Sequence, residues 1–371
     1  MENHKLKIIL SGGGTGGHIY PAVAVAEALK KELGEDVELL FVGAQGKMEM
    51  EKIPALGYKV VGLPVAGLQR RLSPANLKLP FKVAMSVSEA KRTIRNFAAD
   101  VVAGFGGYAS APVLWAAQRL GTPTLIQEQN SFAGVTNKIL SKKAKYICVA
   151  YDGMERFFPS DRIVFTGNPL RGNFAESAER KQAADYFGLS ADKPTILVVG
   201  GSLGTRTLNE AMKNYADQLG ADKDLQVIWQ TGKYYKAEMD DFMSSRNYPG
   251  IWHDAFIDRM DYAYSMADVV ISRSGACTVS ELCLQGKAVI FVPSPNVSED
   301  HQTKNAMALV NKNAAEMIPD DRAVNEVISA ALALLANENR RKELESNIRK
   351  LATPDAAVDV ARCIIELANG R

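Results

Sequence analysis

Cysteine, histidine and long apolar runs are all scarce in this sequence of 371 residues. The four cysteines form no CxxC pair and the four histidines show no HxxxH spacing. This scatter favours free, buried thiols over a disulfide framework or a metal site. No apolar run reaches the roughly 18 residues of a membrane span, and none resembles a signal peptide. We therefore expect a cytoplasmic protein with no metal and no cofactor, which can still contact a membrane surface.

Net charge is also small, at +2, but it is unevenly distributed. Residues 1–165 carry 21 Lys and Arg against 14 Asp and Glu, whereas residues 166–371 carry 23 against 28. Between Gly67 and Ala99, seven basic residues are opposed by Glu89 alone. Such a segment is either a solvated helical face or a surface that meets anionic lipid or nucleic acid.

Short apolar segments alternate with helical segments along the chain, which is typical of α/β proteins with parallel sheets covered by helices on both faces. In the first half we expect strands at Leu6–Leu10, Val37–Val42, Lys59–Leu63, Val101–Ala103, Thr124–Ile126 and Tyr146–Val149. In the second half we expect them at Thr195–Val199, Gln226–Gln230, Val269–Ser272 and Val289–Val292. The rhythm predicts two doubly wound domains that bind ligands at the carboxyl ends of their strands.

Turn signals divide the chain. The turn at Thr166–Pro169 separates a first domain, residues 1–166, from a second, residues 167–352. Thr353 and Pro354 then break the helical pattern, and residues 353–371 hold a separate amphipathic helix at Ala356–Ala368. From its pattern alone, this helix could stay with the second domain or cross back to the first.

Three glycine turns follow strands, at Gly12–Gly17, Gly104–Tyr108 and Gly200–Gly204. The first lies between the strand at Leu6–Leu10 and a helix expected over Ala22–Leu33. Glycine has no Cβ, so the backbone amides of such a turn can approach a ligand where a helix begins. These turns suit anionic or polyhydroxylated ligands.

The first glycine turn is a poor dinucleotide site. Gly12, Gly14 and Gly17 satisfy GxGxxG, but that pattern also needs an acidic residue near the end of the second strand to hold a ribose. The segment Phe41–Gln45 contains none. No glycine turn continues as Gly-Lys-Ser/Thr, which excludes a Walker A loop.

Residues 268–281 form a better nucleotide site, because they again predict a strand, a turn and a helix start. The backbone amides of Ala276, Cys277, Thr278 and Val279 would face a phosphate. Glu281, expected in the first helical turn, would bind two vicinal ribose hydroxyls. The alternative is that Ser280 and Glu281 only cap their helix.

Several motifs resemble the MurG family of glycosyltransferases, in that family's order and over nearly the whole chain. They are Gly-Gly-Thr-Gly-Gly-His at 13–18, Gly-Gly-Tyr at 106–108, Glu-Gln-Asn at 128–130, Gly-Asn-Pro-Leu-Arg at 167–171, Gly-Gly-Ser-Leu-Gly at 200–204 and Arg-Ser-Gly-Ala-Cys-Thr-Val-Ser-Glu at 273–281. Thr205 departs from the pattern, since a small residue such as Ala is expected there, and it would crowd the loop slightly.

The resemblance implies a GT-B fold, in which two Rossmann-like domains face each other across a cleft and the terminal helix returns to the first domain. It also implies transfer of GlcNAc from UDP-GlcNAc to lipid I, with inversion, in peptidoglycan synthesis. In the second domain, the backbone of Ile257 would read uracil, Glu281 the ribose, Ser202 the diphosphate and Gln302 the sugar. Arg171 would add positive charge. From the first domain, Thr15, Gly16, Gly17 and Asn130 would contact the donor sugar or phosphate.

A base must remove the proton of the attacking hydroxyl group, and His18 is the first candidate, because its ordinary pKa suits proton transfer near neutral pH. His18 could instead position the ligand. Glu128 is the alternative base, or a structural carboxylate at a strand end. No paired acidic residues suggest a DxD-type metal site, so we expect metal-independent chemistry.

The implied acceptor carries an undecaprenyl tail, so we expect a peripheral enzyme at the cytoplasmic face of the inner membrane. The basic segment contains Leu68, Leu72, Leu77, Leu79 and Phe81, a mixture that suits an anionic membrane rather than nucleic acid.

Three other functions stay open. They are a UDP-GlcNAc 2-epimerase, a glycosyltransferase that acts on diacylglycerol, and a nucleotide-binding module without catalysis.

Overall fold

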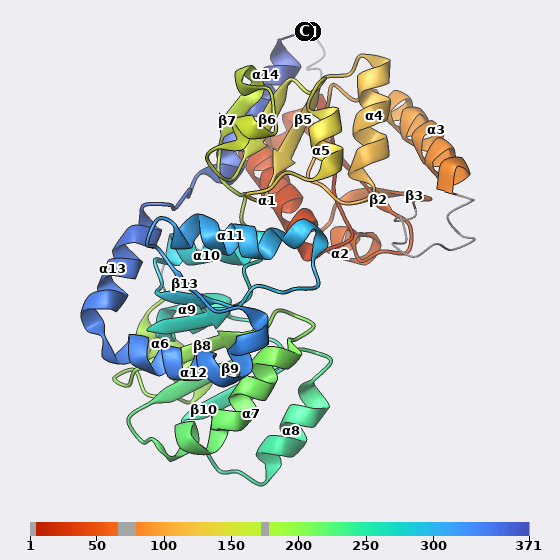
Figure 1. Ribbon diagram of the computed structural model, residues 1–371. Helices are drawn as coiled ribbons and strands as arrows, with labels where there is room; N and C mark the ends of the chain where they lie inside the picture. Colours follow the sequence, from red (N-terminus) through yellow and green to blue (C-terminus); the bar gives the residue numbers. More distant parts are fainter. Residues whose placement is uncertain (1–4, 66–78, 172–177, 371) are drawn as a thin grey trace. The chain divides into compact units, whose positions relative to one another are not determined.

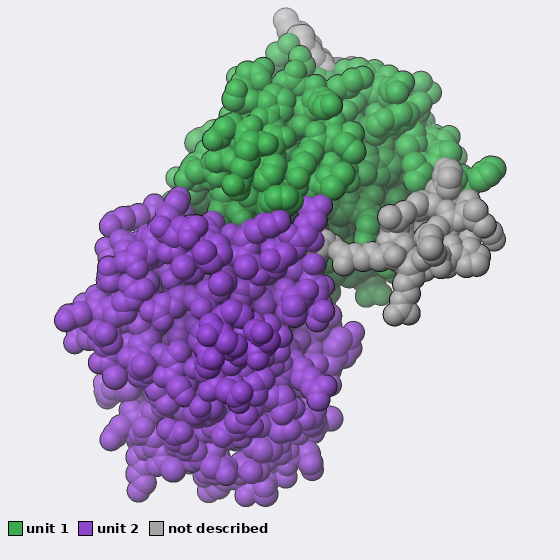
Figure 2. Space-filling model, in the orientation of Figure 1, with its two compact units in different colours: residues 1–172, 353–371 green, residues 173–352 purple. Residues whose placement is uncertain are grey.

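The computed structural model describes residues 5–65, 79–171 and 178–370. They form two compact units, residues 1–172 with 353–371 and residues 173–352 (Figure 2). Each unit contains an all-parallel sheet flanked by helices (Figure 1), so the predicted α/β, doubly wound class is confirmed. The predicted residues Leu68, Leu72 and Leu77 lie outside the described segments.

The sheet of the first unit has the order β3-β2-β1-β4-β5-β6-β7. Its strands are β1 (Leu6–Ser11), β2 (Val37–Ala44), β3 (Lys59–Leu63), β4 (Val101–Gly104), β5 (Thr124–Glu128), β6 (Tyr146–Val149) and β7 (Ile163–Phe165). β2 and β3 lie on one side of β1, and β4 to β7 lie on the other side. The strand order therefore switches between β1 and β4, which are hydrogen-bonded neighbours. The crevice beyond such a switch point is where ligands bind in open α/β sheets.

Helices cover both faces of this sheet. They are α1 (Gly16–Leu33), α2 (Glu49–Ala55), α3 (Leu79–Phe97), α4 (Ser110–Leu120), α5 (Val135–Leu140) and the terminal α14 (Ala356–Asn369). Ile8 and Leu10 of β1 share a core with α1 and α14, whereas Ile9 packs with α3 and α4 on the other face. This alternation is the two-residue period of a strand buried on both sides.

The second unit repeats the arrangement, with strand order β10-β9-β8-β11-β12-β13. Its strands are β8 (Thr195–Val199), β9 (Gln226–Gln230), β10 (Ile251–Asp254), β11 (Val269–Ser272), β12 (Val289–Phe291) and β13 (Glu316–Met317). Its helices are α6 (Arg180–Phe187), α7 (Arg206–Ala221), α8 (Lys236–Ser244), α9 (Met260–Met266), α10 (Ala276–Gln285), α11 (His301–Val310), α12 (Asp320–Ala336) and α13 (Glu338–Arg349). The switch point lies between β8 and β11.

The first unit extends beyond the turn at Thr166–Pro169 that was expected to end it. A side chain at Gly167 would overlap Thr353, and Arg171 forms an ion pair with Glu27 of α1 (Nε to Oε1, 3.3 Å). These contacts keep the segment after the turn with the first unit. The terminal helix α14 also packs there, since its Val360 and Ile364 belong to the core that contains α1.

Candidate active site

The first glycine turn lies at the switch point of its sheet, between the end of β1 and the start of α1. The helix begins at Gly16 rather than at Ala22 as expected, and Thr15 occupies the N-cap position in extended conformation. The backbone amides of His18 and Ile19 donate to the Thr15 carbonyl (3.1 and 3.2 Å). Gly16 and Gly17 therefore form the first helical turn, where amides have no acceptor within the helix.

His18 is held at this helix start by both glycine turns of the unit. Its Nδ1 lies 3.4 Å from the Thr15 hydroxyl oxygen. The ring lies against the second turn, because a Cβ at Gly106 would come within 2.9 Å of Cδ2 and 3.0 Å of Nε2. Gly106 has a positive φ of 92°, and its lack of a side chain makes room for the imidazole ring. Phe105 N–H, at the end of β4, donates to Ser11 O (2.7 Å) and joins the two turns.

Glu128 is a buried carboxylate at the end of β5, and it accepts four hydrogen bonds. The donors are Asn130 N and Nδ2 (3.2 and 3.3 Å) on Oε1, and Gly134 N and Asn137 Nδ2 (3.2 and 2.8 Å) on Oε2. Burial raises the pKa of Glu128, and these hydrogen bonds oppose the rise. With both oxygens engaged, the carboxylate is arranged to fix the loop that carries Asn130 rather than to collect a proton.

In the second unit, the turn after β11 leads into α10, whose N-cap is Gly275. Val279 N–H donates to Gly275 O (2.9 Å). The expectation that the Val279 amide faces a ligand is therefore wrong, and Ala276, Cys277 and Thr278 make up the first turn of the helix. Ser280 is not a cap either, because its hydroxyl donates back to Ala276 O (3.1 Å).

Glu281 is the sixth residue of α10, so it lies in the second helical turn and not in the first as expected. The hydroxyl of Tyr264, on α9, donates to its Oε2 (2.9 Å). Burial raises the pKa of the Glu281 carboxyl, and this hydrogen bond partly opposes the rise. The buried Tyr264 thus holds Oε2 of Glu281 and fixes the orientation of Oε1.

The third glycine turn, after β8, is closed by Thr205. This side chain is 8% exposed, and its hydroxyl donates to Gly200 O (2.8 Å) and accepts from Arg273 Nε (3.3 Å). Thr205 therefore joins the two ends of the turn instead of crowding it, contrary to expectation. Ser202, at the exposed tip, accepts a hydrogen bond from Lys233 N–H on its carbonyl oxygen (3.1 Å).

Arg273 connects the loops around this edge of the sheet. Its guanidinium also forms an ion pair with Asp320 (2.6 Å) and donates to the carbonyls of Val292 and Pro293 (2.8 and 3.0 Å). Burial lowers the pKa of Arg273, and Asp320 opposes the change. Sequence reasoning assigned it no role, although an arginine directly after a buried strand is a recognisable signal.

Gln302 and Ile257 complete the predicted set in this unit. Gln302 accepts from Ser294 N–H on Oε1 (2.8 Å) and from the Ser274 hydroxyl on its backbone carbonyl (2.8 Å). Ile257 has a buried side chain and lies in the loop between β10 and α9. In the described part of the chain, no group of three or more His, Cys, Asp or Glu side chains is placed to hold a metal ion.

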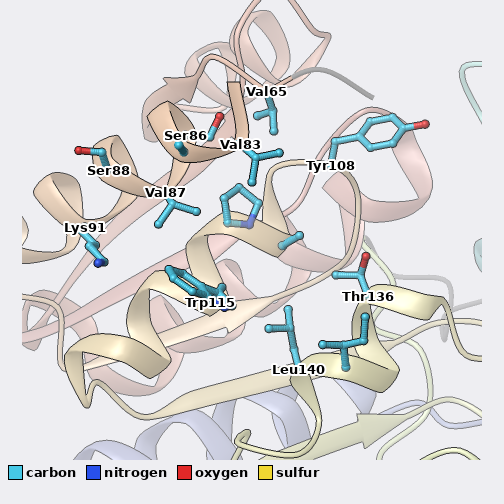
Figure 3. Close-up of a pocket in the computed structure, with 14 residues that line it drawn as sticks. Val65, Val83, Ser86, Val87, Ser88, Lys91, Tyr108, Trp115, Thr136 and Leu140 are labelled. Carbon is cyan, nitrogen blue, oxygen red and sulfur yellow. The ribbon is translucent and has the colours of Figure 1, made fainter. Parts of the chain in front are cut away.

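A large apolar pocket lies in the first unit among α3, α4 and α5 (Figure 3). Its volume is about 780 Å³, and it is lined by Val65, Val83, Ala84, Ser86, Val87, Ser88, Lys91, Tyr108, Ala111, Pro112, Trp115, Thr136, Ile139 and Leu140. Lys91 and Arg119 both lie over the Trp115 ring. On the same helices Phe81 and Ile139 are 78% and 63% exposed. No helix within the described ranges is long and apolar enough to cross a bilayer.

Known proteins resemble the chain over nearly its full length. Residues 8–149 match the glycosyltransferase family 28 N-terminal domain, and residues 195–360 match the C-terminal domain of that family. The chain is 52% identical to the UDP-N-acetylglucosamine–N-acetylmuramyl-(pentapeptide) pyrophosphoryl-undecaprenol N-acetylglucosamine transferase of Parabacteroides distasonis, over 98% of both chains. The enzyme of that name from Bacteroides fragilis is 51% identical, over 99% of this chain and 98% of its own.

Solved structures agree. The crystal structure of Acinetobacter baumannii MurG is 31% identical, with a TM-score of 0.78, and the match covers 97% of this chain and 99% of that one. A UDP-GlcNAc 2-epimerase from Neisseria meningitidis, bound to UDP-GlcNAc, shares the fold at 13% identity and a TM-score of 0.70, covering 97% and 100%. The chain therefore belongs to glycosyltransferase family 28 and, within it, to the MurG family of N-acetylglucosamine transferases.

Proposed function

We propose that the protein transfers GlcNAc from UDP-GlcNAc to the 4-hydroxyl of MurNAc in lipid I, inverting the anomeric centre and forming lipid II. The observation that carries this proposal is the pair of polar turns at the switch points of the two sheets. One presents His18 beside the backbone amides of a helix start, and the other presents the half-buried Glu281 beside a second set. Relatives about 50% identical along the full chain bear the name of this transferase.

The donor's nucleotide belongs to the second unit in this proposal. Glu281 receives the ribose hydroxyls on Oε1, since Tyr264 holds Oε2. The amides of Ala276 to Thr278 and the turn around Ser202 meet the diphosphate at helix N-termini, where the macrodipole favours negative charge. The backbone of Ile257 reads uracil. Gln302 presents its Nε2 to the sugar, because Oε1 is held by Ser294.

The acceptor reacts beside His18. In the tautomer whose Nδ1–H donates to the Thr15 hydroxyl, Nε2 carries the lone pair, on the ring edge that lies toward Gly106. Nε2 takes the proton of the 4-hydroxyl as its oxygen bonds to the anomeric carbon and the bond to UDP breaks. Asn130, fixed by Glu128, orients the sugars. Gly16 and Gly17 leave room for them at the helix start.

Charge on the departing diphosphate is met by helix-start amides and by a cation. We assign the cation to Arg171, which would exchange its ion pair with Glu27 for the phosphate. That pair is partly exposed, so its loss costs little.

The lipid acceptor requires work at a bilayer, and we propose peripheral attachment at the cytoplasmic face of the inner membrane. The face that carries the pocket combines exposed Phe81 and Ile139 with Lys91 and Arg119. Apolar side chains mixed with cations bind anionic lipid surfaces. Leu79 is the first residue of α3. The other residues predicted to contact the membrane precede it in the sequence, and they are Leu68, Leu72 and Leu77.

The proposal is tested by transfer of labelled GlcNAc from UDP-GlcNAc to lipid I. We expect labelled lipid II, no transfer to diacylglycerol, and no UDP-ManNAc when the donor is incubated alone. Label only in the glycerolipid would identify a different acceptor. Formation of UDP-ManNAc without acceptor would contradict the transferase proposal and identify a 2-epimerase, a class of enzyme with a solved structure of the same fold.

His18→Ala should lower kcat by at least about 100-fold, the usual range for loss of a general base. The dissociation constant of UDP-GlcNAc, measured by calorimetry, should stay within about twofold because the nucleotide binds elsewhere. His253→Ala is the matched control, since that ring lies on β10 near Asp240 (3.4 Å). Full turnover by His18→Ala would remove the assigned base, whereas loss of turnover with retained binding excludes a module without catalysis.

Donor affinity should depend on pH through Glu281. Its raised pKa means that acidification protonates the carboxylate above the ordinary glutamate value of 4.5, which weakens hydrogen bonds to the ribose. We expect UDP-GlcNAc affinity to be highest at neutral pH and to fall through that raised pKa. Glu281→Gln should bind about tenfold more weakly at neutral pH and lose this dependence. Glu238→Gln, on α8, is the control. An unchanged pH profile in Glu281→Gln would exclude the ribose role.

Membrane attachment should weaken when Phe81 and Ile139 are both replaced by serine. We expect affinity for phosphatidylglycerol vesicles, measured by sedimentation, to drop at least about tenfold because two apolar side chains no longer enter the bilayer. Phe165→Ser is the control, because Phe165 is also an exposed phenylalanine but lies on the edge strand β7, and this variant should bind normally. If the parent protein, the double variant and Phe165→Ser bound vesicles equally, the face around Phe81 would be a solvated surface with no role in membrane attachment.

A further inference from the structure

Glu49 is a buried carboxylate beneath the first glycine turn, and nothing in the proposed chemistry uses it. It is the first residue of α2 and is 1% exposed. Gly14 N–H donates to its Oε2 (3.0 Å), and Ala44 N–H, at the end of β2, donates to its Oε1 (2.9 Å). A buried carboxylate is costly unless its oxygens are hydrogen-bonded, and here each oxygen has a backbone donor.

Two glycines provide the space that this side chain occupies. A Cβ at Gly13 would overlap the Glu49 carboxylate, and a Cβ at Gly43 would overlap its Cγ. Neither glycine has a positive φ, so the backbone conformation does not require glycine at these positions. The requirement comes from the glutamate, which makes Glu49, Gly13 and Gly43 one packed unit.

The hydrogen bonds from Gly14 and Ala44 to the Glu49 carboxylate, together called the Glu49 clamp, are connected to His18 through Thr15. Gly14 has a φ of 83° and precedes Thr15, whose carbonyl accepts from the His18 amide and whose hydroxyl faces Nδ1. Gly13 O also lies against Gly107, where any Cβ would overlap it. Fixing Gly14 therefore fixes the N-cap that orients the imidazole, and fixing Gly13 sets how the second turn packs.

We propose that Glu49 is a positioning residue for glycosyl transfer, which holds the first glycine turn in the conformation that aims His18 at the acceptor. This inference rests on the proposed role of His18. A carboxylate is needed because two separate N–H groups require two acceptors. Glutamine offers one oxygen and one NH₂, which opposes one of the amides, and aspartate is one methylene shorter.

The test compares Glu49→Gln with Glu51→Gln, an exposed glutamate on the same short helix. For Glu49→Gln we expect kcat to fall about 10- to 100-fold, since small misplacements of a catalytic group have such costs. The KM for UDP-GlcNAc should stay within about twofold. Hydrogen exchange at the Gly14 amide should accelerate, while the thermal transition stays near that of the parent protein. Glu51→Gln should match the parent in every measurement.

Glu49→Asp guards against a folding defect, because it keeps the charge and should show a smaller loss of kcat with the same unchanged KM. Folded Glu49 variants with parental kcat, or with a slow-exchanging Gly14 amide, would overturn the clamp. A parallel rise in the KM for UDP-GlcNAc would also overturn it, since that result indicates general disruption. If the parent protein transfers no GlcNAc to lipid I, the proposed function fails, whereas the exchange rate of Gly14 still tests the clamp.

Discussion

In a parallel sheet the carboxyl ends of all strands lie at the same edge, and this constraint determines where the loops of both units meet. In each unit the chain starts in the middle of the sheet, moves outward, and returns to the other side of its first strand. The chain therefore leaves β1 and β4 toward opposite faces of the sheet, with α1 on one face and α4 on the other. The three glycine turns, after β1, β4 and β8, and the turn after β11 lie at these two crevices, where helix N-termini favour anionic ligands.

Buried charged groups hold the loops in place at these edges. In the first unit, the carboxylates of Glu49 and Glu128 accept hydrogen bonds mainly from backbone and amide N–H groups. In the second, Arg273 joins Asp320 and the carbonyls of two other loop residues. Removing one member of such a set leaves a desolvated charge, which is why these side chains constrain loop shape more strongly than apolar packing does.

The regular elements were predictable because burial on both faces makes parallel strands read as apolar runs. Five predicted strands, among them Lys59–Leu63 and Val269–Ser272, match the structure in both bounds. The strands missed, β7, β10 and β13, are short and lie at or near sheet edges, where the apolar signal is weakest. The start of α1 was placed late because glycine disfavours helix interiors, yet Gly16 and Gly17 occupy a first turn that tolerates them. Glu49 was missed because no local pattern marks a carboxylate that folds back onto a turn thirty-five residues earlier.

That missed glutamate changes what the GxGxxG spacing means here. In a dinucleotide site the acidic residue after the second strand points outward to a ribose. Here an acid also follows the second strand, four residues beyond Gln45, but both its oxygens bind backbone amides and one of these belongs to the glycine turn itself. Gly13, which the GxGxxG spacing does not require to be glycine, makes room here for Glu49, and Gly106 of the second turn makes room for the ring of His18. The turn is therefore shaped around two side chains of its own protein, and this supports its assignment to proton transfer rather than to nucleotide binding.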